Sequence, residues 1–187
     1  MNKNEAREKI LEAAEELYYQ KGFAAVGMDE LRTAAGVSLR RMYALFPAKG
    51  DIISAVLQRK HLEWEASMSS AVAAAGSDPR GRLLAVYSHL EQWFCSDGFR
   101  GCAFINAFGE LGGTHPEVAR IVMEHKKSFQ QQMADFAADM GLRPQLANQL
   151  SMLAEGAQTT AAISADPQAA IQARAAAEVL IDASLAR

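Results

Sequence analysis

The stretch Met28–Lys49, MDELRTAAGVSLRRMYALFPAK, decides how the rest of the chain is interpreted. Its first half has apolar residues at spacings of three and four, which predicts a short helix ending at Gly36. Glycine has no Cβ and therefore leaves a helix easily in the left-handed conformation. Ser38 predicts the start of a second helix, because its hydroxyl can accept from the free N–H groups of the next turn. The apolar residues of the first helix are Met28, Leu31 and Ala35.

The second helix of this stretch divides into two faces by residue spacing. Leu39, Met42 and Phe46 recur at spacings of three and four and are predicted to turn inward. Two short helices joined by a tight turn with glycine form a helix-turn-helix, whose second helix lies in the major groove of DNA. On spacing alone, an ordinary pair of core helices with solvated charges remains an equal alternative. The predicted outer face consists of Arg40, Arg41, Tyr43 and Ala44.

Pro47 ends the second helix, and Lys49 stands at the start of the next one. Helix N-termini attract phosphate, because their N–H groups are unpaired and the helix dipole is positive there. Lys49 is therefore a candidate for clamping the DNA backbone. The other residues expected to contact DNA are Met28, Thr33, Ser38, Leu39, Arg40, Arg41 and Tyr43.

The N-terminal part of the chain resembles the DNA-binding domain of the tetracycline-repressor (TetR) family of bacterial regulators. The resemblance is centred on Ala35-Gly36-Val37-Ser38 and needs no gap across the first third of the chain. It implies an all-α fold of about nine helices. A three-helix DNA-binding domain would occupy residues 1–48, and a helical bundle for ligand binding and dimerisation would occupy residues 49–187. The other residues that carry the resemblance are Ile10, Ala13, Ala14, Leu17, Gly22, Phe23, Tyr43, Phe46, Pro47, Lys49 and Ile52.

Four positions depart from the residues usual in that family. Gly27 stands where a threonine commonly caps the second helix, a change that costs only about a few tenths of a kcal/mol. Leu45 replaces a frequent histidine, Arg32 replaces a small alanine, and Arg41 replaces a threonine or serine. The two arginines can form bidentate contacts with guanine or clamp phosphates, or they can be solvated surface charges. The sequence therefore assigns no residue to a base.

Composition and charge agree with a DNA-binding chain of moderate size. The chain has 187 residues, 50% of them hydrophobic, and a formal net charge of −3. This length allows one compact domain, or a small domain attached to a larger one. The location of charge matters more than its total, and the stretch from Gly27 to Lys49 contains four basic residues and two acidic ones. Lys3, Arg7 and Lys9 can add to this local basic patch, which is enough for salt-sensitive phosphate contact.

No stretch has the apolar length of a membrane span, and the N-terminus reads as a charged amphipathic helix rather than a signal sequence. We therefore expect a cytoplasmic protein that does not bind membranes. Cys95 and Cys102 flank the loop Ser96-Asp97-Gly98. A redox pair is conceivable, but a reducing compartment and the absence of Cys-x-x-Cys spacing favour two buried thiols.

Beyond the DNA-binding stretch the pattern is helical throughout, with neither strand alternation nor an internal repeat. Clusters of glycine and proline at residues 76–79, 112–116 and 141–144 predict breaks between helices. The helices expected between these breaks cover residues 49–74, 80–94, 102–111, 118–136, 144–163 and 167–185.

The last two expected helices are rich in alanine. Small residues allow close helix approach, and flat faces suit pairing with a copy of the same chain. By resemblance, family members dimerise through these helices as a four-helix bundle. The alternative is that they only complete the monomer core, but a two-fold protein matches a palindromic DNA site. The expected faces are Leu146, Leu150, Leu153, Ala157 and Ala161 in one helix, and Ile171, Ala175, Ala176, Val179 and Ile181 in the other.

The middle helices carry many aromatic and methionine side chains. An apolar cavity with a few polar groups is typical of a small-molecule site, and in the family this domain binds an inducer between its helices. Each residue taken singly is explained equally well as ordinary core. The residues expected to bind a small apolar or aromatic effector are Trp64, Met68, Tyr87, Leu90, Phe94, Phe104, Phe108, His125, Phe129 and Glu155.

We expect no catalytic residue, metal site or cofactor. His61 and Glu65 lie one helical turn apart, but the Glu-x-x-His sets of di-iron bundle enzymes, a phosphate loop and a nucleophile elbow do not occur. The expected function is a repressor that binds a palindromic double-stranded operator as a homodimer and is released by a small molecule. A helical small-molecule-binding protein without a DNA-binding role, and a bundle enzyme, are the alternatives. The sequence does not specify the effector, the operator, the regulated genes or the choice between repression and activation.

Overall fold

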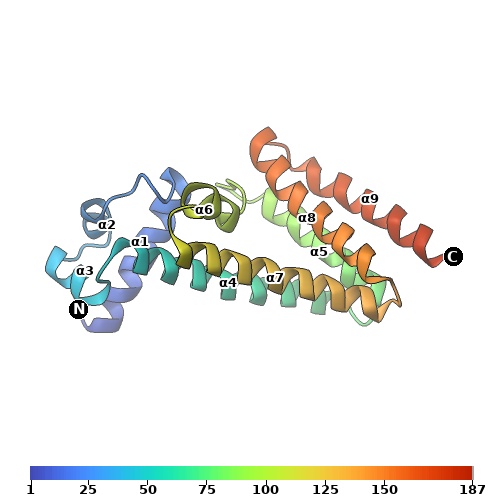
Figure 1. The fold of residues 1–187 in the computed structure, drawn as a ribbon, viewed down its shortest axis with the longest axis horizontal. Coiled ribbons are helices and arrows are strands. Elements are labelled where there is room, and N and C mark those ends of the chain that lie inside the picture. Colours follow the sequence, from blue (N-terminus) through green and yellow to red (C-terminus); the bar gives the residue numbers. More distant parts are fainter. Residues whose placement is uncertain (187) are drawn as a thin grey trace. The chain divides into compact units, whose positions relative to one another are not determined.

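The computed structural model describes residues 1–186, and its regular structure over that range is entirely α-helical (Figure 1). The described residues form nine helices, which confirms the expected all-α fold. The helices are α1 Lys3–Lys21, α2 Met28–Ala34, α3 Leu39–Leu45, α4 Lys49–Ala74, α5 Pro79–Phe94, α6 Ala103–Leu111, α7 Pro116–Asp139, α8 Pro144–Ser164 and α9 Gln168–Leu185.

The helix boundaries follow local sequence signals. Pro144 occupies the first turn of α8, where a missing backbone N–H costs nothing. Gly76 follows α4 with a φ of 80°, and Gly141 follows α7 with a φ of 69°. Both φ values lie in the left-handed region, which glycine adopts without a Cβ clash. The breaks predicted from glycine and proline are thus confirmed to within a few residues.

The helices group into two compact units. The first contains Met1–Leu62 with Ala103–His125, and the second contains Glu63–Cys102 with the chain from Lys126 onward. Helix α6 therefore belongs to the same unit as α1, α2 and α3, although it comes much later in the sequence. The expected boundary after residue 48 separates a DNA-binding part from a ligand-binding and dimerisation part. The grouping of helices by contact does not test this division of roles, so it stays a prediction.

The core of the first unit is formed where α1, α2 and α3 pack against each other. Ile10 of α1, Leu31 of α2 and Met42 of α3 are fully buried. The Tyr18 ring stacks on Phe23 at 5.1 Å between ring centroids, which closes the end of α1. Full burial of one large apolar side chain contributes about 1.5–3 kcal/mol, so these few residues hold the three helices together.

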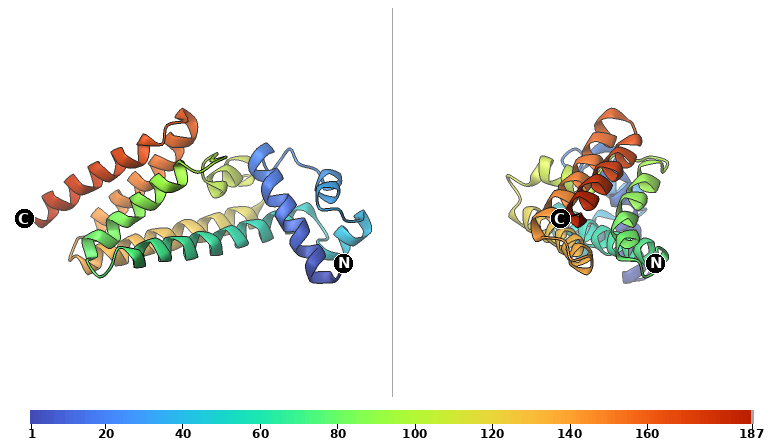
Figure 2. Two further views of the ribbon diagram at one scale, coloured as in Figure 1. Left: turned by 180° about the vertical axis from the view of Figure 1, so that it is seen from behind. Right: turned by 90° about the vertical axis from the view of Figure 1, so that its right-hand side faces the viewer.

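The core of the second unit is formed mainly by α5, α8 and α9. Figure 2 shows these helices side by side. Alanines such as Ala154, Ala170 and Ala177 are fully buried, and their small side chains allow close helix approach. The buried Tyr87 hydroxyl donates to the backbone oxygen of Leu150 at 2.8 Å, so the one polar atom of this side chain is paired.

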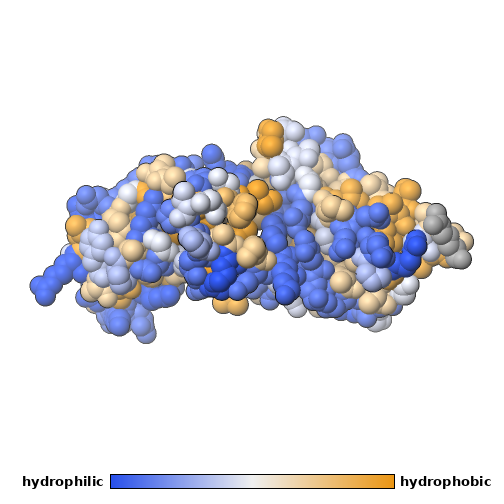
Figure 3. Space-filling model, in the orientation of Figure 1, coloured by the Kyte–Doolittle hydropathy of each residue, from blue (hydrophilic) through white to orange (hydrophobic). Residues whose placement is uncertain are grey.

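The face of α8 expected to pair with a second copy is largely internal. Leu146, Leu150, Ala157 and Ala161 are buried in the core of the second unit, because α8 packs against both α5 and α9. On α9 the expected face divides: Ile181 is buried, whereas Ile171, Ala175, Ala176 and Val179 are exposed. Apolar surface accordingly gathers over α8 and α9 in Figure 3.

Candidate functional site

Helices α2 and α3 form the expected helix-turn-helix. Gly36 has a φ of 63° and opens the turn, and the N–H of Val37 donates to the oxygen of Arg32 at 3.1 Å. The Ser38 hydroxyl accepts from the N–H of Arg41 at 3.3 Å, which confirms its role as the cap of α3. Gly27 precedes α2 in extended conformation and supplies no side-chain cap. The local sequence thus determines the turn and the start of α3, whereas α2 begins without a side-chain cap.

Helix α3 has a buried and an exposed face. Met42 and Phe46 are buried as predicted, but Leu39 is 39% exposed, so its predicted inward orientation was wrong. Leu39 is the first residue of α3, and its exposure agrees with its place among the residues expected to contact DNA. Tyr43 is 46% exposed, and Arg40 is exposed beside it. The outer face of α3 therefore presents Leu39, Arg40 and Tyr43 to solvent.

The two arginines of α3, Arg40 and Arg41, differ in their contacts with the rest of the chain. The Nη2 atom of Arg41 donates to the backbone oxygens of Met1 and Asn2 at 2.9 and 2.8 Å. Arg40 makes no hydrogen bond or ion pair with any part of the chain that the structure describes. Arg40 is thus available to an external partner, whereas Arg41 ties α3 to the N-terminus of α1.

Three further residues expected to contact DNA have different surroundings. The exposed Thr33 hydroxyl donates to the oxygen of Asp29 at 2.8 Å, and Met28 is half-buried at the start of α2. Lys49 donates from Nζ to the backbone oxygen of Ala24 at 3.0 Å. Burial lowers the pKa of the Lys49 ammonium from its ordinary value, and the Glu110 carboxylate partly opposes that shift. Lys49 is thus engaged inside the first unit.

The residues expected to bind an effector fall into both units. In the first unit, the Phe104 and His125 rings stack with centroids 3.6 Å apart and planes 8° apart. The Nδ1 atoms of His125 and His61 lie 3.1 Å apart. Phe108 is 50% exposed, so it forms no part of the apolar core. The first unit therefore contains a cluster of Phe104, His125 and His61. Phe108, which was also expected to bind an effector, lies outside this cluster.

In the second unit, most of the expected effector residues are packed in the core. Met68, Tyr87, Leu90, Phe94 and Phe129 are buried, and Trp64 lies 6.3 Å from Phe129 between ring centroids. Lys126 and Glu155 form an ion pair at 3.6 Å. These positions stay predictions for an effector site.

Several polar side chains that were not among the residues expected to bind an effector lie in the same unit. The Glu65 carboxylate accepts from Ser128 and, at 3.4 Å, from Gln132. His89 lies 3.2 Å from the Ser67 hydroxyl and has its ring 5.4 Å from that of Trp64. Pairs from different helices leave no short-range sequence signal, which is why only coordinates bring them together.

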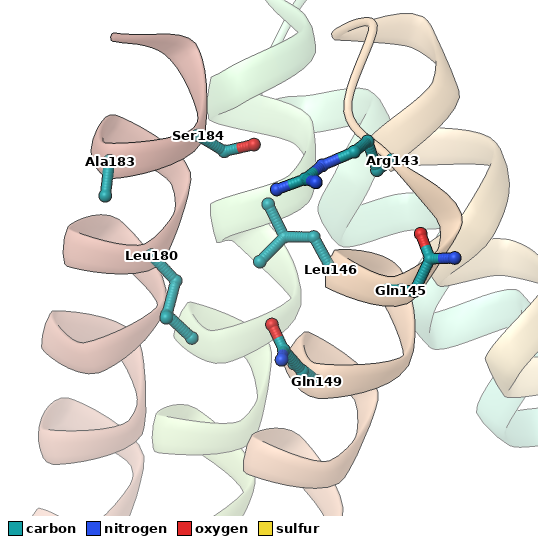
Figure 4. A pocket seen from close by; sticks show the side chains of 7 residues that line it. All are labelled: Arg143, Gln145, Leu146, Gln149, Leu180, Ala183 and Ser184. Carbon is teal, nitrogen blue, oxygen red and sulfur yellow. The ribbon is translucent and has the colours of Figure 1, made fainter. Parts of the chain in front are cut away.

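A surface pocket of about 430 Å³ lies between the start of α8 and the end of α9. Figure 4 shows Leu146 and Leu180 pointing toward each other across it, with Arg143 and Ser184 reaching inward above them. None of the ten residues expected to bind an effector lines this pocket. Its walls belong to the two helices expected to dimerise. The remaining walls are Gln145, Gln149 and Ala183.

The two cysteines differ from each other. Cys102 is buried and Cys95 is exposed, so the expectation of two buried thiols was wrong for Cys95, which follows directly after the end of α5. Both thiols are free. Within residues 1–186, no three His, Cys, Asp or Glu side chains gather in a way that could bind a metal ion. No helix in that range combines the length and apolar character needed to cross a bilayer.

Residues 10–56 match the model of the bacterial regulatory proteins of the tetR family. The HTH-type transcriptional repressor NemR of Escherichia coli K12 is 29% identical over 115 residues, covering 59% of this chain and 58% of NemR. The HTH-type transcriptional activator FasR of Mycolicibacterium smegmatis is 37% identical over 83 residues, covering 44% of this chain and 37% of FasR. The matched part of the chain thus spans between about a third and three-fifths of these curated relatives.

Similarity to a solved structure extends over nearly the whole chain. The TetR transcriptional regulator sav143 of Streptomyces avermitilis superimposes with a TM-score of 0.81 at 31% identity, covering 96% of this chain and 97% of sav143. Its likeness includes the helix-turn-helix and the helices that follow it. The chain therefore belongs to the TetR family of bacterial transcriptional regulators.

Proposed function

We propose that this chain represses transcription by binding a palindromic operator as a homodimer and that a small molecule releases it. In this proposal residues 1–48 read the DNA, and residues 49–187 bind the effector and dimerise. The observation that carries the proposal is the outer face of α3. It exposes Tyr43 and leaves Arg40 without an internal partner among the described residues, as a helix that enters the major groove requires. Since a bacterial operator lies in the cytoplasm, we expect the protein to act there.

The exposed apolar surface of α8 and α9 supports a dimer. Met152 and Ile163 of α8, and Ile171 and Val179 of α9, are all exposed. Contiguous apolar surface on a folded protein commonly marks an interaction site, and most homo-oligomers are two-fold dimers. A two-fold dimer presents two copies of α3, whose separation would match half-sites about one helical turn of DNA apart.

Release by an effector requires that the effector bind two states of the protein unequally. A ligand that prefers a conformation with a different spacing of the α3 helices lowers DNA affinity by the same coupling factor. Coupling energies of about 1–3 kcal/mol correspond to roughly 5- to 150-fold changes in affinity, which is enough to switch a promoter. The aromatic clusters around Phe104 and around Trp64 are consistent with a small apolar or aromatic effector.

Repression is proposed rather than activation because the relative matched over the larger share of this chain, NemR, is named a repressor. FasR is named an activator, so the direction of control needs its own measurement. A reporter gene placed behind the selected operator, with and without the chain, distinguishes the two: repression lowers its expression and activation raises it.

Selection of bound duplexes from a random DNA pool with the purified chain tests the proposal directly. We expect inverted half-sites, with affinity that falls steeply as salt rises, because phosphate contacts release counterions. A variant with both R40Q and R41Q should lose this affinity. Failure of the unaltered chain to bind any duplex at low salt would refute DNA reading and favour the alternative, a helical small-molecule-binding protein. A thermal-shift screen with aromatic compounds, followed by measurement of DNA release, tests the effector.

A further inference from the structure

The loop between α1 and α2 is held by two oppositely charged side chains at one residue. The N–H of Ala24 donates to Oε2 of Glu110 in α6 at 2.7 Å. The carbonyl oxygen of Ala24 accepts from Nζ of Lys49, the first residue of α4, at 3.0 Å. Hydrogen bonds to ionised groups are roughly twice as strong as those between neutral groups. Ala24 is thus the point at which three elements of the first unit meet.

The backbone beside Ala24 is shaped to admit the Glu110 carboxylate. Gly22 has a φ of 92°, and a Cβ placed on it would lie 3.0 Å from both carboxylate oxygens of Glu110. The N–H of Gly22 remains bonded to the oxygen of Tyr18 at 2.9 Å, so the loop leaves α1 in a defined direction. Any other residue at this position would be strained and would crowd the carboxylate. Gly22 and Glu110 therefore form a matched pair.

The two charges also act on each other across the Ala24 peptide. The Glu110 carboxylate raises the pKa of Lys49, opposing the larger lowering caused by burial, and so favours the charged ammonium. Glu110 thereby strengthens the Lys49 contact as well as its own. The loop leads directly into α2, whose packing against α3 sets the direction of the exposed face of α3. Holding Ala24 therefore constrains the helix-turn-helix from outside it.

We propose that Glu110 is a positioning residue for DNA binding: by holding the Ala24 N–H, it fixes the entry of α2 and so the orientation of the recognition helix α3. This inference rests on the proposed DNA-binding function. Glu110 touches no DNA in this scheme. It acts from α6, a helix outside the residues 10–56 that match the family model.

The test compares E110A and E110Q with E117A as a matched control. Glu117 is an exposed residue of α7 in the same unit and pairs with Arg120. E110A removes the acceptor and should weaken binding to the selected operator by roughly 5- to 10-fold, at the lower end of coupling between sites. Its salt dependence should stay unchanged, because no phosphate contact is lost. E110Q keeps an oxygen that accepts from Ala24 but loses the charge, so it should recover part of the affinity. E117A should bind as the unaltered chain does.

Amide hydrogen exchange supplies a readout that needs no DNA. E110A should speed exchange at the Ala24 N–H and at the start of α2, and E110Q should restore protection. If E110A does not fold, E110D gives the same test, since the shorter side chain keeps the charge but withdraws the carboxylate from the Ala24 N–H. Operator affinity for E110A equal to that of the unaltered chain would overturn the inference, as would E110Q as weak as E110A. Unchanged exchange at Ala24 would overturn it even for a chain that binds no duplex, which separates this failure from failure of the proposed function.

Discussion

Arg41 donates from Nη2 to the backbone oxygen of Asn2 at 2.8 Å, which joins the recognition helix to the first residues of the chain. Asn2 in turn caps α1, accepting from the N–H of Glu5 at 2.9 Å. Arg41 therefore helps to position α3 on α1, whereas its neighbour Arg40 reaches solvent. Two adjacent arginines of the same helix thus have different roles.

Replacing Arg40 should affect DNA binding more than replacing Arg41. R40A removes a side chain free to contact phosphate or a base, so operator affinity should fall about tenfold or more, with the melting temperature unchanged. If the contact is to phosphate, the slope of log affinity against log salt concentration should also become shallower by about 0.9. R41A should lower the melting temperature slightly and retain more affinity. Fluorescence anisotropy in a salt series measures these effects, with K127A as an exposed control on α7. A greater loss for R41A would contradict the assignment.

Adding a charge to the exposed face of α9 should disrupt the proposed dimer. Val179 is 68% exposed, and V179E would place a carboxylate in an apolar interface, where its desolvation is unfavourable. We expect a monomer in sedimentation experiments. Operator binding should be much weaker, because a monomer contacts one half-site and a dimer contacts two. M123E changes an exposed methionine of α7 and serves as the control. A V179E protein that remains dimeric would exclude this face from the interface.

The buried hydrogen bond of Tyr87 should contribute measurably to stability. Y87F keeps the ring but leaves the oxygen of Leu150 without this donor, and we expect a loss of about 1 kcal/mol in the free energy of unfolding. Urea unfolding followed by circular dichroism measures the change. If Tyr87 instead faced an effector cavity open to water, Y87F would leave stability unchanged.

His89 should make the protein less stable in mild acid. Burial lowers its pKa from the ordinary 6.5, so the unfolded chain binds a proton more readily than the folded one. The stability contributed by neutral His89 is complete above pH 6.5 and is lost as pH falls through the lower folded pKa. Thermal unfolding between neutral pH and pH 5 measures this loss, and H89Q should flatten that part of the profile. An equally steep profile for H89Q would assign the acid sensitivity to other groups.

Much of the helix-turn-helix was predictable because its signals are local. Gly36 opens the turn after α2 and Ser38 caps α3 through contacts within a few residues, and a single sequence contains the signals for such contacts. The inward orientation predicted for Leu39 was wrong because helical spacing alone does not say which side chains the neighbouring helices cover. The effector residues were less predictable for the same reason: Tyr87 and Phe108 both carry aromatic rings at helical spacing, yet one is buried and the other is half exposed.

The sequence by itself determined the helices, their boundaries and the family, since caps, breaks and apolar periodicity act over one or two turns. Only the tertiary structure decided which charged side chains make contacts within the protein. The packing of α6 brings Glu110 to Ala24, a residue 86 positions earlier, and the start of α4 brings Lys49 to the same residue, whereas Arg40 stays exposed. Such contacts depend on how whole helices pack, because the free energy that holds them comes from burial across the core rather than from neighbouring residues.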